Sequence, residues 1–308
     1  MVAHRRRGAR CLVYPPLVVS TVVHVQGSSA SNEDTYLLVE QQGLYAVVDG
    51  ATSLVPYCGP NGESGGLAAA RLVTEVLGHY AGQGANDPLP LVAVLKLAND
   101  ELRTAMTAAG IDVSRPEERW GACVAAVRLH ADYLEVAQIG DAVLALVQAD
   151  GSVTLATPNQ LVGVSRITRE RCREANERVF SCANERHAFI REGLLANRQL
   201  ANTQGGYGVL NGQPEAESFI CSRRIRRESV QALLLMTDGL AFPGTEHEDG
   251  LGIPEVIAHV QLMGLASYAQ WLLEQEQEDR ACLRFPRAKV SDDKTGIWLS
   301  FVAPNVCR

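Results

Sequence analysis

The 308-residue chain has little lysine and few aromatic residues, which make up 6% of it. Lys96, Lys289 and Lys294 are its three lysines, so arginine supplies nearly all of the positive charge. No apolar stretch is long enough to span a membrane. The absence of a Cys-x-x-Cys pair and of a nearby histidine cluster argues against a zinc site. Because internal repeats and low-complexity linkers are also absent, we expect one domain.

Eight cysteines are spread along the chain. Their even number permits a disulfide interpretation, but Cys123 and Cys221 lie in apolar, strand-like runs, where free cysteine behaves as a small hydrophobic residue. We therefore expect reduced cysteines and a cytoplasmic protein. The net charge of −7 argues against a nucleic-acid-binding protein, and we expect no membrane partner.

The N-terminal residues resemble the beginning of a secretory signal peptide. Arg5-Arg6-Arg7 precedes an apolar run over residues 12–23. However, Pro15-Pro16 interrupts that run, and no Ala-x-Ala cleavage site follows it. We interpret residues 1–16 as a basic tail and place the first strand directly after it.

Apolar periodicity predicts an order of strands and helices that fits two antiparallel sheets. Short turns between strands favour antiparallel pairing, and paired helices argue against a doubly wound parallel sheet. The expected fold is α+β, a four-layer α-β-β-α sandwich with two central antiparallel sheets. The expected strands are 18–25, 35–39, 44–48, 122–129, 133–139, 143–147, 216–222, 232–237 and 296–302, and the expected helices are 67–80, one opening at Pro88 or Pro90, about 168–187, 251–262 and 266–283.

Five acidic segments, four of them directly beside a strand-like run, are candidate metal-binding elements. A carboxylate at the end of a buried strand is held rigidly and can still face a cleft. Mg²⁺ and Mn²⁺ prefer oxygen ligands in near-octahedral geometry, and two such ions about 3.5–4 Å apart can clamp a phosphate and activate a water. The segments are Asn32-Glu33-Asp34, Val47-Val48-Asp49-Gly50, Ile139-Gly140-Asp141, Met236-Thr237-Asp238-Gly239 and Ser291-Asp292-Asp293-Lys294-Thr295.

The sequence offers no convincing protein nucleophile. It has no Cys-x₅-Arg segment and no Ser-His-Asp pattern, which disfavours covalent catalysis. Two divalent cations would instead neutralise the charge of a phosphate and lower the pKa of a bridging water. The acidic segments therefore favour metal-dependent hydrolysis of a phosphomonoester.

In this order and spacing, the five segments resemble those of the metal-dependent serine/threonine phosphatases of the protein phosphatase 2C type, in their compact bacterial form. The similarity covers residues 18–302. It implies a catalytic domain over residues 17–303, with a flap-like insertion at 160–215. It also implies Mn²⁺ or Mg²⁺ as cofactor, a phosphorylated protein as substrate, and a paired serine/threonine kinase as a further partner.

The resemblance implies a catalytic metal centre built on Asp49, Asp238 and Asp292. Asp49 would bridge two ions. The carbonyl of Gly50 and, through a water, Glu33 would serve one ion, whereas Asp238 and Asp292 would serve the other.

The remaining carboxylates receive supporting roles from the same resemblance. Asp141 would help to hold a weaker third ion, and an ordinary turn role is its alternative. Asp34 and Asp293 would lie behind the direct ligands, although Asp34 in place of Glu33 as a direct ligand stays open.

The sequence departs from the family pattern at the position that usually binds the substrate phosphate. The family usually has an arginine four residues before the glutamate of the first segment, whereas this chain has Ser29. Arg198 and Lys294 are two candidate replacements that the sequence does not rank. Ala51 stands where some members have a proposed general-acid histidine, and residues 53–64 form an insertion beside the metals.

Three functions stay open. The first is a phosphatase acting on phosphoserine or phosphothreonine in proteins. The second is the same fold acting on a small phosphorylated metabolite, which the missing arginine permits. The third is a degenerate phosphatase fold used as a regulatory binding module, although carboxylates that repel without metal argue against it. Residues 169–178 and 223–227 are interpreted as a solvated helix face and an exposed turn, with phosphoprotein docking and anion binding as alternatives.

Overall fold

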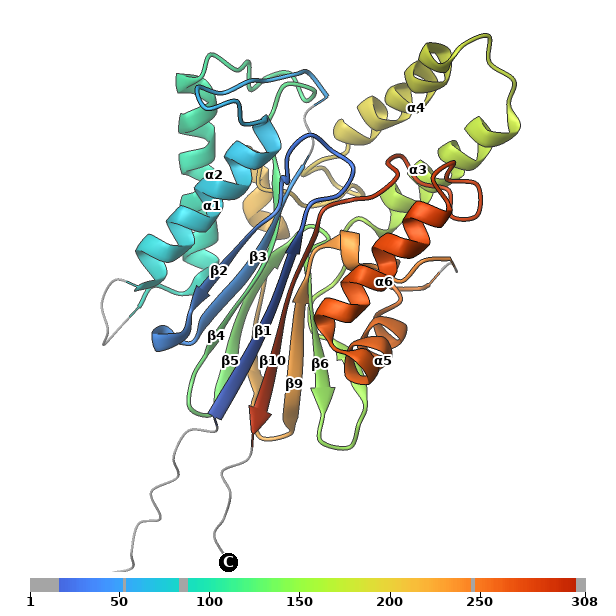
Figure 1. Ribbon diagram of the computed structural model, residues 1–308. Coiled ribbons are helices and arrows are strands. Elements are labelled where there is room, and N and C mark those ends of the chain that lie inside the picture. The colour runs from blue at the N-terminus through green and yellow to red at the C-terminus, as the bar shows by residue number, and fades with distance from the viewer. Residues whose placement is uncertain (1–16, 52–53, 83–87, 245–246, 303–308) are drawn as a thin grey trace, which may run out of the picture.

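The computed structural model describes residues 17–51, 54–82, 88–244 and 247–302, so the basic tail lies outside the described residues. Two five-stranded antiparallel sheets face each other, and helices cover their outer faces (Figure 1). The four-layer α-β-β-α sandwich is therefore confirmed. One sheet has the order β1 (Leu17–Val25), β10 (Lys294–Val302), β9 (Val230–Met236), β6 (Val143–Gln148), β7 (Val153–Leu155), and the other β2 (Thr35–Val39), β3 (Leu44–Gly50), β4 (Ala122–Leu129), β5 (Tyr133–Ile139), β8 (Cys221–Arg226).

Side chains of β3 alternate between two hydrophobic cores. Leu44, Ala46 and Val48 face the helix layer, whereas Tyr45 and Val47 pack between the two sheets. Because successive side chains of a strand point to opposite faces, a strand covered on both faces is a continuous apolar run. This explains why the central strands were recognisable in the sequence.

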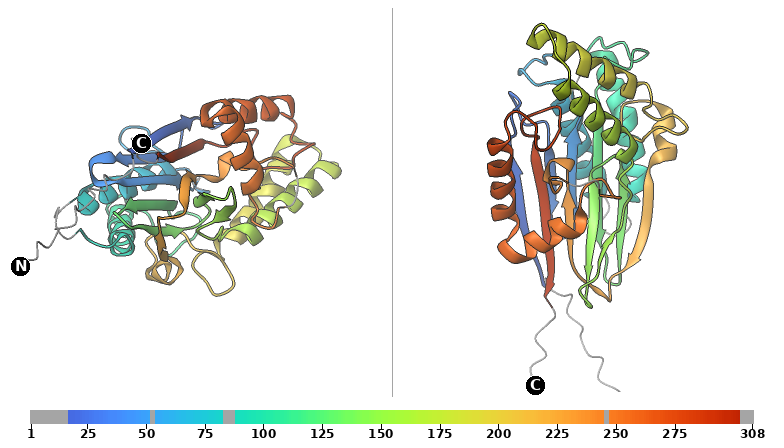
Figure 2. Two further views of the ribbon diagram at one scale, coloured as in Figure 1. Left: turned by 90° about the horizontal axis from the view of Figure 1, so that it is seen from below. Right: turned by 90° about the vertical axis from the view of Figure 1, so that its right-hand side faces the viewer.

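Two helix pairs cover the sandwich and a third extends from one end of it. The third pair lies at the end opposite to the points where β1 begins and β10 finishes (Figure 2). The pairs are α1 (Gly65–Gly82) with α2 (Leu91–Ala108) on the β2–β8 sheet, α5 (Ile253–Met263) with α6 (Leu265–Glu278) on the β1–β7 sheet, and α3 (Val162–Glu177) with α4 (Ala183–Arg198) at the end.

Several predicted elements were wrong at polar segments. The helix expected at about 168–187 is two helices, because residues 178–182 break it. The strand expected at 216–222 begins only at Cys221, after the 3₁₀ helix Pro214–Phe219. Residues 223–226 lie in β8 rather than in an exposed turn; as an edge strand with solvent-facing arginines, β8 lacks apolar alternation. The last helix stops at Glu278, five residues early.

Among the described residues, no single helix is long and apolar enough to cross a membrane. Helices α5 and α6 reach that length and composition only when taken together, across a bend of 118°.

Lys294, the first residue of β10, links that strand to α6. Its side chain is fully buried, and its ammonium donates hydrogen bonds to Glu276 at 2.8 Å and to the carbonyl of Asp292 at 2.9 Å. Removing one partner of a buried pair leaves the other charge uncompensated. Lys294 is therefore a structural residue whose charge is already paired.

Replacing Lys294 with methionine should lower the free energy of unfolding by about 3 kcal/mol, because Glu276 would lose its buried partner. Urea denaturation measures this loss. The control is Lys96→Met, since Lys96 pairs with Glu217 on the surface and should contribute less than about 1 kcal/mol. Equal losses in the two variants would contradict a special role for the buried pair.

Candidate metal centre

The strand register delivers the acidic segments to one end of the sandwich. Asp49 is opposite Cys123, the second residue of β4, so β3 ends where β4 begins. By the same antiparallel alternation, β5 ends at that end of its sheet. In the other sheet β9 ends where β10 begins, and the hydrogen bond from Thr237, directly after β9, to Asp34 places this point at the same end of the sandwich. Helices α3 and α4 lie at this end (Figures 1 and 2). Residues far apart in the sequence therefore meet at one site.

The aspartates of this site lie within range of each other's charge. Burial raises the pKa of Asp49 well above its ordinary value, and the charges of four other aspartates raise it further. Burial likewise raises the pKa of Asp238, with Asp141 and Asp292 adding to the effect. Asp141 is 7% exposed, whereas Asp49 and Asp238 remain partly accessible to solvent. The structure thus gathers Asp34, Asp49, Asp141, Asp238 and Asp292 into one acidic cluster.

Glu33 is fixed by close backbone packing. A Cβ on Gly50 would overlap the carbonyl oxygens of Glu33 and Gly66, and one on Gly66 would come within 2.8 Å of the Glu33 carboxylate. The Ser64 hydroxyl donates a hydrogen bond to that carboxylate, and it also accepts the Leu67 N–H at 3.2 Å. The beginning of α1 therefore holds Glu33 beside the Gly50 backbone.

Asp34 is anchored behind the cluster. It is 2% exposed, and its Oδ2 accepts a hydrogen bond from the Thr237 hydroxyl at 2.8 Å. Burial raises the pKa of Asp34 to about 7, although hydrogen bonds from Thr295 and Thr237 act in the opposite direction. These hydrogen bonds hold the Asp34 carboxylate in place behind the cluster.

Asp293 organises the loop after β1. Its Oδ1 accepts the Gly27 N–H at 2.7 Å, and its Oδ2 accepts the Glu33 N–H at 2.8 Å. Both carboxylate oxygens are therefore engaged with backbone, which suits the supporting role expected for Asp293. Nearby, the Ser28 N–H donates to the Ser291 carbonyl at 2.9 Å, which pairs the two segments.

Asp292 is held by a residue that sequence reasoning missed. Its Oδ1 accepts a hydrogen bond from the Lys289 ammonium at 2.8 Å and from the Asp293 N–H at 3.0 Å. Burial alone would lower the pKa of Lys289, but the neighbouring carboxylates, led by Asp292, outweigh it and raise that pKa. A cation of the chain itself thus stands in the acidic cluster.

The donor set fits a hard divalent cation. As the side chains stand, no three His, Cys, Asp or Glu residues in the described part of the chain are arranged to hold one ion. Yet the available donors are carboxylate and backbone carbonyl oxygens, which Mg²⁺ and Mn²⁺ prefer. Burial, together with the charges of neighbouring aspartates, raises the pKa values of these carboxylates. A bound divalent ion would stabilise their charged forms.

A family model described as Protein phosphatase 2C matches residues 24–277. The chain belongs to the protein phosphatase 2C family. The matched residues include four of the five acidic segments and end before Asp292. Members of this family are metal-dependent serine/threonine phosphatases. A comparison with curated proteins gives no match.

Solved bacterial phosphatases have a similar fold. The Mycobacterium tuberculosis serine/threonine phosphatase PstP/Ppp is 19% identical with a TM-score of 0.55, covering 92% of this chain and 99% of that one. The PstP catalytic domain in complex with two manganese ions gives 19% identity and a TM-score of 0.53, covering 92% and 98%. Stp1 from Staphylococcus aureus is 15% identical with a TM-score of 0.54, covering 96% of this chain and 99% of that one. At these identities the likeness supports the fold alone.

The structure ranks the two candidate replacements for the missing phosphate-binding arginine of the 2C phosphatases. Lys294 is fully buried, and its ammonium is already bonded to Glu276 and to the Asp292 carbonyl. Arg198, at the end of α4, bonds the Tyr207 hydroxyl and lies close enough to Asp141 to act against the rise of its pKa. Of the two, Arg198 is therefore better placed to contact a phosphate at the acidic cluster.

The described part of the inserted loop, residues 54–64, connects three parts of the site. Ser64 contacts Glu33, and the carbonyl of Leu54 accepts a hydrogen bond from Arg191 of α4 at 3.1 Å. Tyr57 packs on Trp120 with ring centroids 4.7 Å apart, which anchors the loop to the core. Residue 53 lies outside the described residues.

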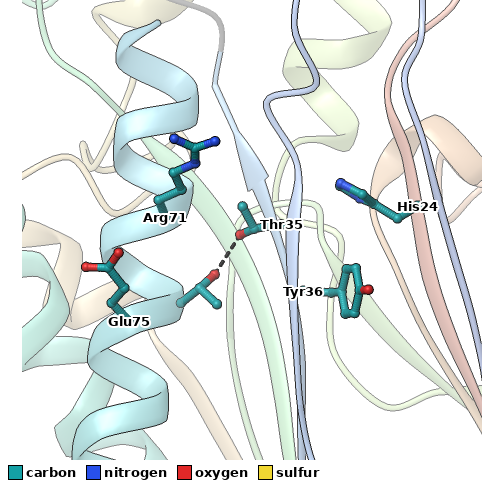
Figure 3. Close-up of a pocket in the computed structure, with 6 residues that line it drawn as sticks. His24, Thr35, Tyr36, Arg71 and Glu75 are labelled. Atoms are coloured by element: carbon teal, nitrogen blue, oxygen red, sulfur yellow. Dashed lines mark hydrogen bonds between the residues drawn. The ribbon is translucent and has the colours of Figure 1, made fainter. Parts of the chain in front are cut away.

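A groove of about 370 Å³ adjoins the centre at the β1–β2 side. Figure 3 shows Arg71 and Glu75 reaching from α1 on one side, with His24 and Tyr36 on the other. Thr35 directly follows Asp34, and its hydroxyl is 2.6 Å from that of Thr74. The lining residues are His24, Thr35, Tyr36, Arg71, Thr74 and Glu75.

Three side chains that shape the site were not predicted. Ser64 had a usable signal, because a serine directly before the Gly65-Gly66 opening of a helix is a common N-cap. Thr237 lies within the acidic segment 236–239, but the sequence does not indicate its hydrogen bond to Asp34. Lys289 had no signal beyond its position three residues before Asp292.

The metal-free protein should lose stability as pH rises. Because the pKa of Asp34 is about 7 in the folded state and near 3.8 when unfolded, the folded state keeps a proton that the unfolded state releases. This contribution is complete below the unfolded pKa and disappears as pH rises through 7. Calorimetry with EDTA should show Tm falling from about pH 5 to about pH 8.

Asp34→Asn is the matched variant for this pH effect, and its Tm should depend less on pH over the same range. A Tm that rises with pH in the wild-type protein would contradict the assignment of a raised pKa to this cluster.

Proposed function

We propose that this protein removes phosphate from phosphoserine or phosphothreonine in proteins, using Mn²⁺ or Mg²⁺ bound at the acidic cluster. The observation that supports the proposal is the gathering of five aspartates at one end of a protein phosphatase 2C sandwich. A serine/threonine kinase acting on the same substrates would be the opposing partner.

Each carboxylate receives a role in this proposal. Asp49, at the end of β3 and in the field of the other aspartates, would bridge two ions. Asp238 and Asp292 would hold one ion, and the Gly50 carbonyl with Glu33 would hold the other. The packing of Glu33 against Gly50 and Gly66 supports that pairing.

Other residues would position these ligands. Asp141 would serve a third ion, supported by its burial and its place in the cluster. Asp34, through Thr237, and Asp293, through the Gly27 and Glu33 amides, would keep the ligand segments in register. Residues 160–215, which include α3 and α4, would form the flap.

The chemistry would require no protein nucleophile. Two divalent ions held by these carboxylates would neutralise phosphate charge and would lower the pKa of a bound water. The chain's own contribution is to hold the carboxylates rigidly at strand ends and to present them to solvent on one side. Because Ala51 has no proton to donate, the leaving group would take its proton from water.

Asp49→Asn should lower turnover by at least about a hundredfold, since loss of a bridging charge removes several kcal/mol of transition-state stabilisation. The assay uses Mn²⁺ with p-nitrophenyl phosphate and a phosphothreonine peptide. Asp100→Asn, an exposed position on α2, is the control. Wild-type-like turnover in Asp49→Asn would contradict the proposal.

The same assay distinguishes the competing functions. Hydrolysis of small phosphate esters without any phosphopeptide activity would favour the metabolite phosphatase. A wild-type protein that neither hydrolyses these substrates nor gains melting temperature with Mn²⁺ would favour a binding module.

Replacing residues 54–62 with a shorter glycine linker should raise KM for the preferred phosphopeptide several-fold, because the shortened loop no longer brings the backbone carbonyl of residue 54 to Arg191 of α4. Ser64 is retained, so Glu33 keeps its hydrogen bond and Mn²⁺ affinity should change little. Steady-state kinetics and calorimetry measure the two quantities. An unchanged KM on every substrate would mean that the loop has no part in substrate binding.

A further inference from the structure

Lys289 lies where a divalent cation would be expected to act. Its Nζ is 2.8 Å from Asp292 Oδ1, and the side chains of Lys289 and Asp292 are 33% and 41% exposed. Its charge also reaches Asp49 and Asp238, two other expected metal ligands. One ammonium therefore offsets the repulsion among three carboxylates.

The other two lysines have different surroundings. Lys96 pairs with Glu217 at 2.7 Å on the surface, and Lys294 is buried on Glu276. In a chain with only three lysines, one is thus placed against the expected metal ligands.

An ammonium and a divalent ion cannot both sit close to Asp292 without mutual repulsion. A unit charge and a double charge about 5 Å apart repel strongly enough to change an equilibrium by roughly tenfold or more, even at high effective dielectric constant. The side chain of Lys289 is flexible and partly exposed, so its ammonium can leave toward solvent.

We propose that Lys289 is a tethered cation that stabilises the metal-free site and must be displaced from Asp292 when metal binds. Lys289 thereby sets the metal concentration at which the site fills. The inference rests on the proposed function, because it requires that Asp238 and Asp292 bind a divalent ion.

Lys289→Met tests the displacement directly, with MnCl₂ as the probe and calorimetry as the readout. The dissociation constant of the ion at Asp238 and Asp292 should fall by roughly tenfold, because the competing charge is gone. The metal-free variant should melt below the wild type, and Mn²⁺ should raise its Tm by more than it raises that of the wild type. Lys289→Arg keeps the charge and should retain wild-type affinity, and Lys96→Met controls for loss of a lysine elsewhere.

An unchanged or higher dissociation constant in Lys289→Met would overturn the inference. A higher value would mean that the ammonium supports the loaded site rather than competing with it. Absence of Mn²⁺ binding in the wild type would instead overturn the proposed function, and this inference with it.

A second measurement uses the wild-type protein and does not depend on how a variant folds. Acetylation with a limiting reagent, followed by peptide mass spectrometry, reports the reactivity of each lysine. Saturating Mn²⁺ should raise the rate at Lys289 several-fold, because its ammonium is released from Asp292. Lys96 should be unchanged, and Lys294 should stay unreactive in its buried pair. An unchanged or slower rate at Lys289 would contradict displacement.

Discussion

Repulsion among carboxylates gathered at one end of the sandwich is the constraint on which this site depends. Burial and neighbouring charge together raise the pKa values of Asp34, Asp49, Asp141 and Asp238. A folded protein tolerates such a cluster only if protons, a cation of its own, or bound metal compensate the charge. In the described structure Asp34 and Asp293 are compensated by hydrogen bonds, whereas Asp292 is compensated by Lys289.

The two sheets hold the repelling carboxylates together at one site. Antiparallel pairing brings the ends of β3 and β5 together in one sheet and the end of β9 and the beginning of β10 together in the other. The Thr237–Asp34 hydrogen bond joins the two sheets at this end. Close packing of Gly50 and Gly66 then leaves no room for a side chain between Glu33 and the β3 end. Rigid strands fix the carboxylates on one side, and helices α3 and α4 lie at the same end.

Much of this arrangement could be predicted from sequence because its signals are local. Central strands covered on both faces are unbroken apolar runs, and four of the five acidic segments lie directly beside a strand-like run. The bounds of the edge strand β8 could not be predicted because its arginines face solvent and interrupt the apolar pattern. The break between α3 and α4 has no strong helix-stop signal in the sequence. The Lys289–Asp292 contact depends on the path of the loop after α6. Asp279 shapes that loop by accepting the N–H groups of three later residues, and apolar periodicity does not encode this loop conformation.

The central claim is that the carboxylates around Asp49 form a centre for two divalent ions. Anomalous diffraction at the manganese edge, from crystals grown with MnCl₂, tests it most directly. The account predicts two peaks about 3.5–4 Å apart that share Asp49, with Asp238 and Asp292 on one of them. Peaks located elsewhere, or no peak within bonding distance of Asp49, would contradict it.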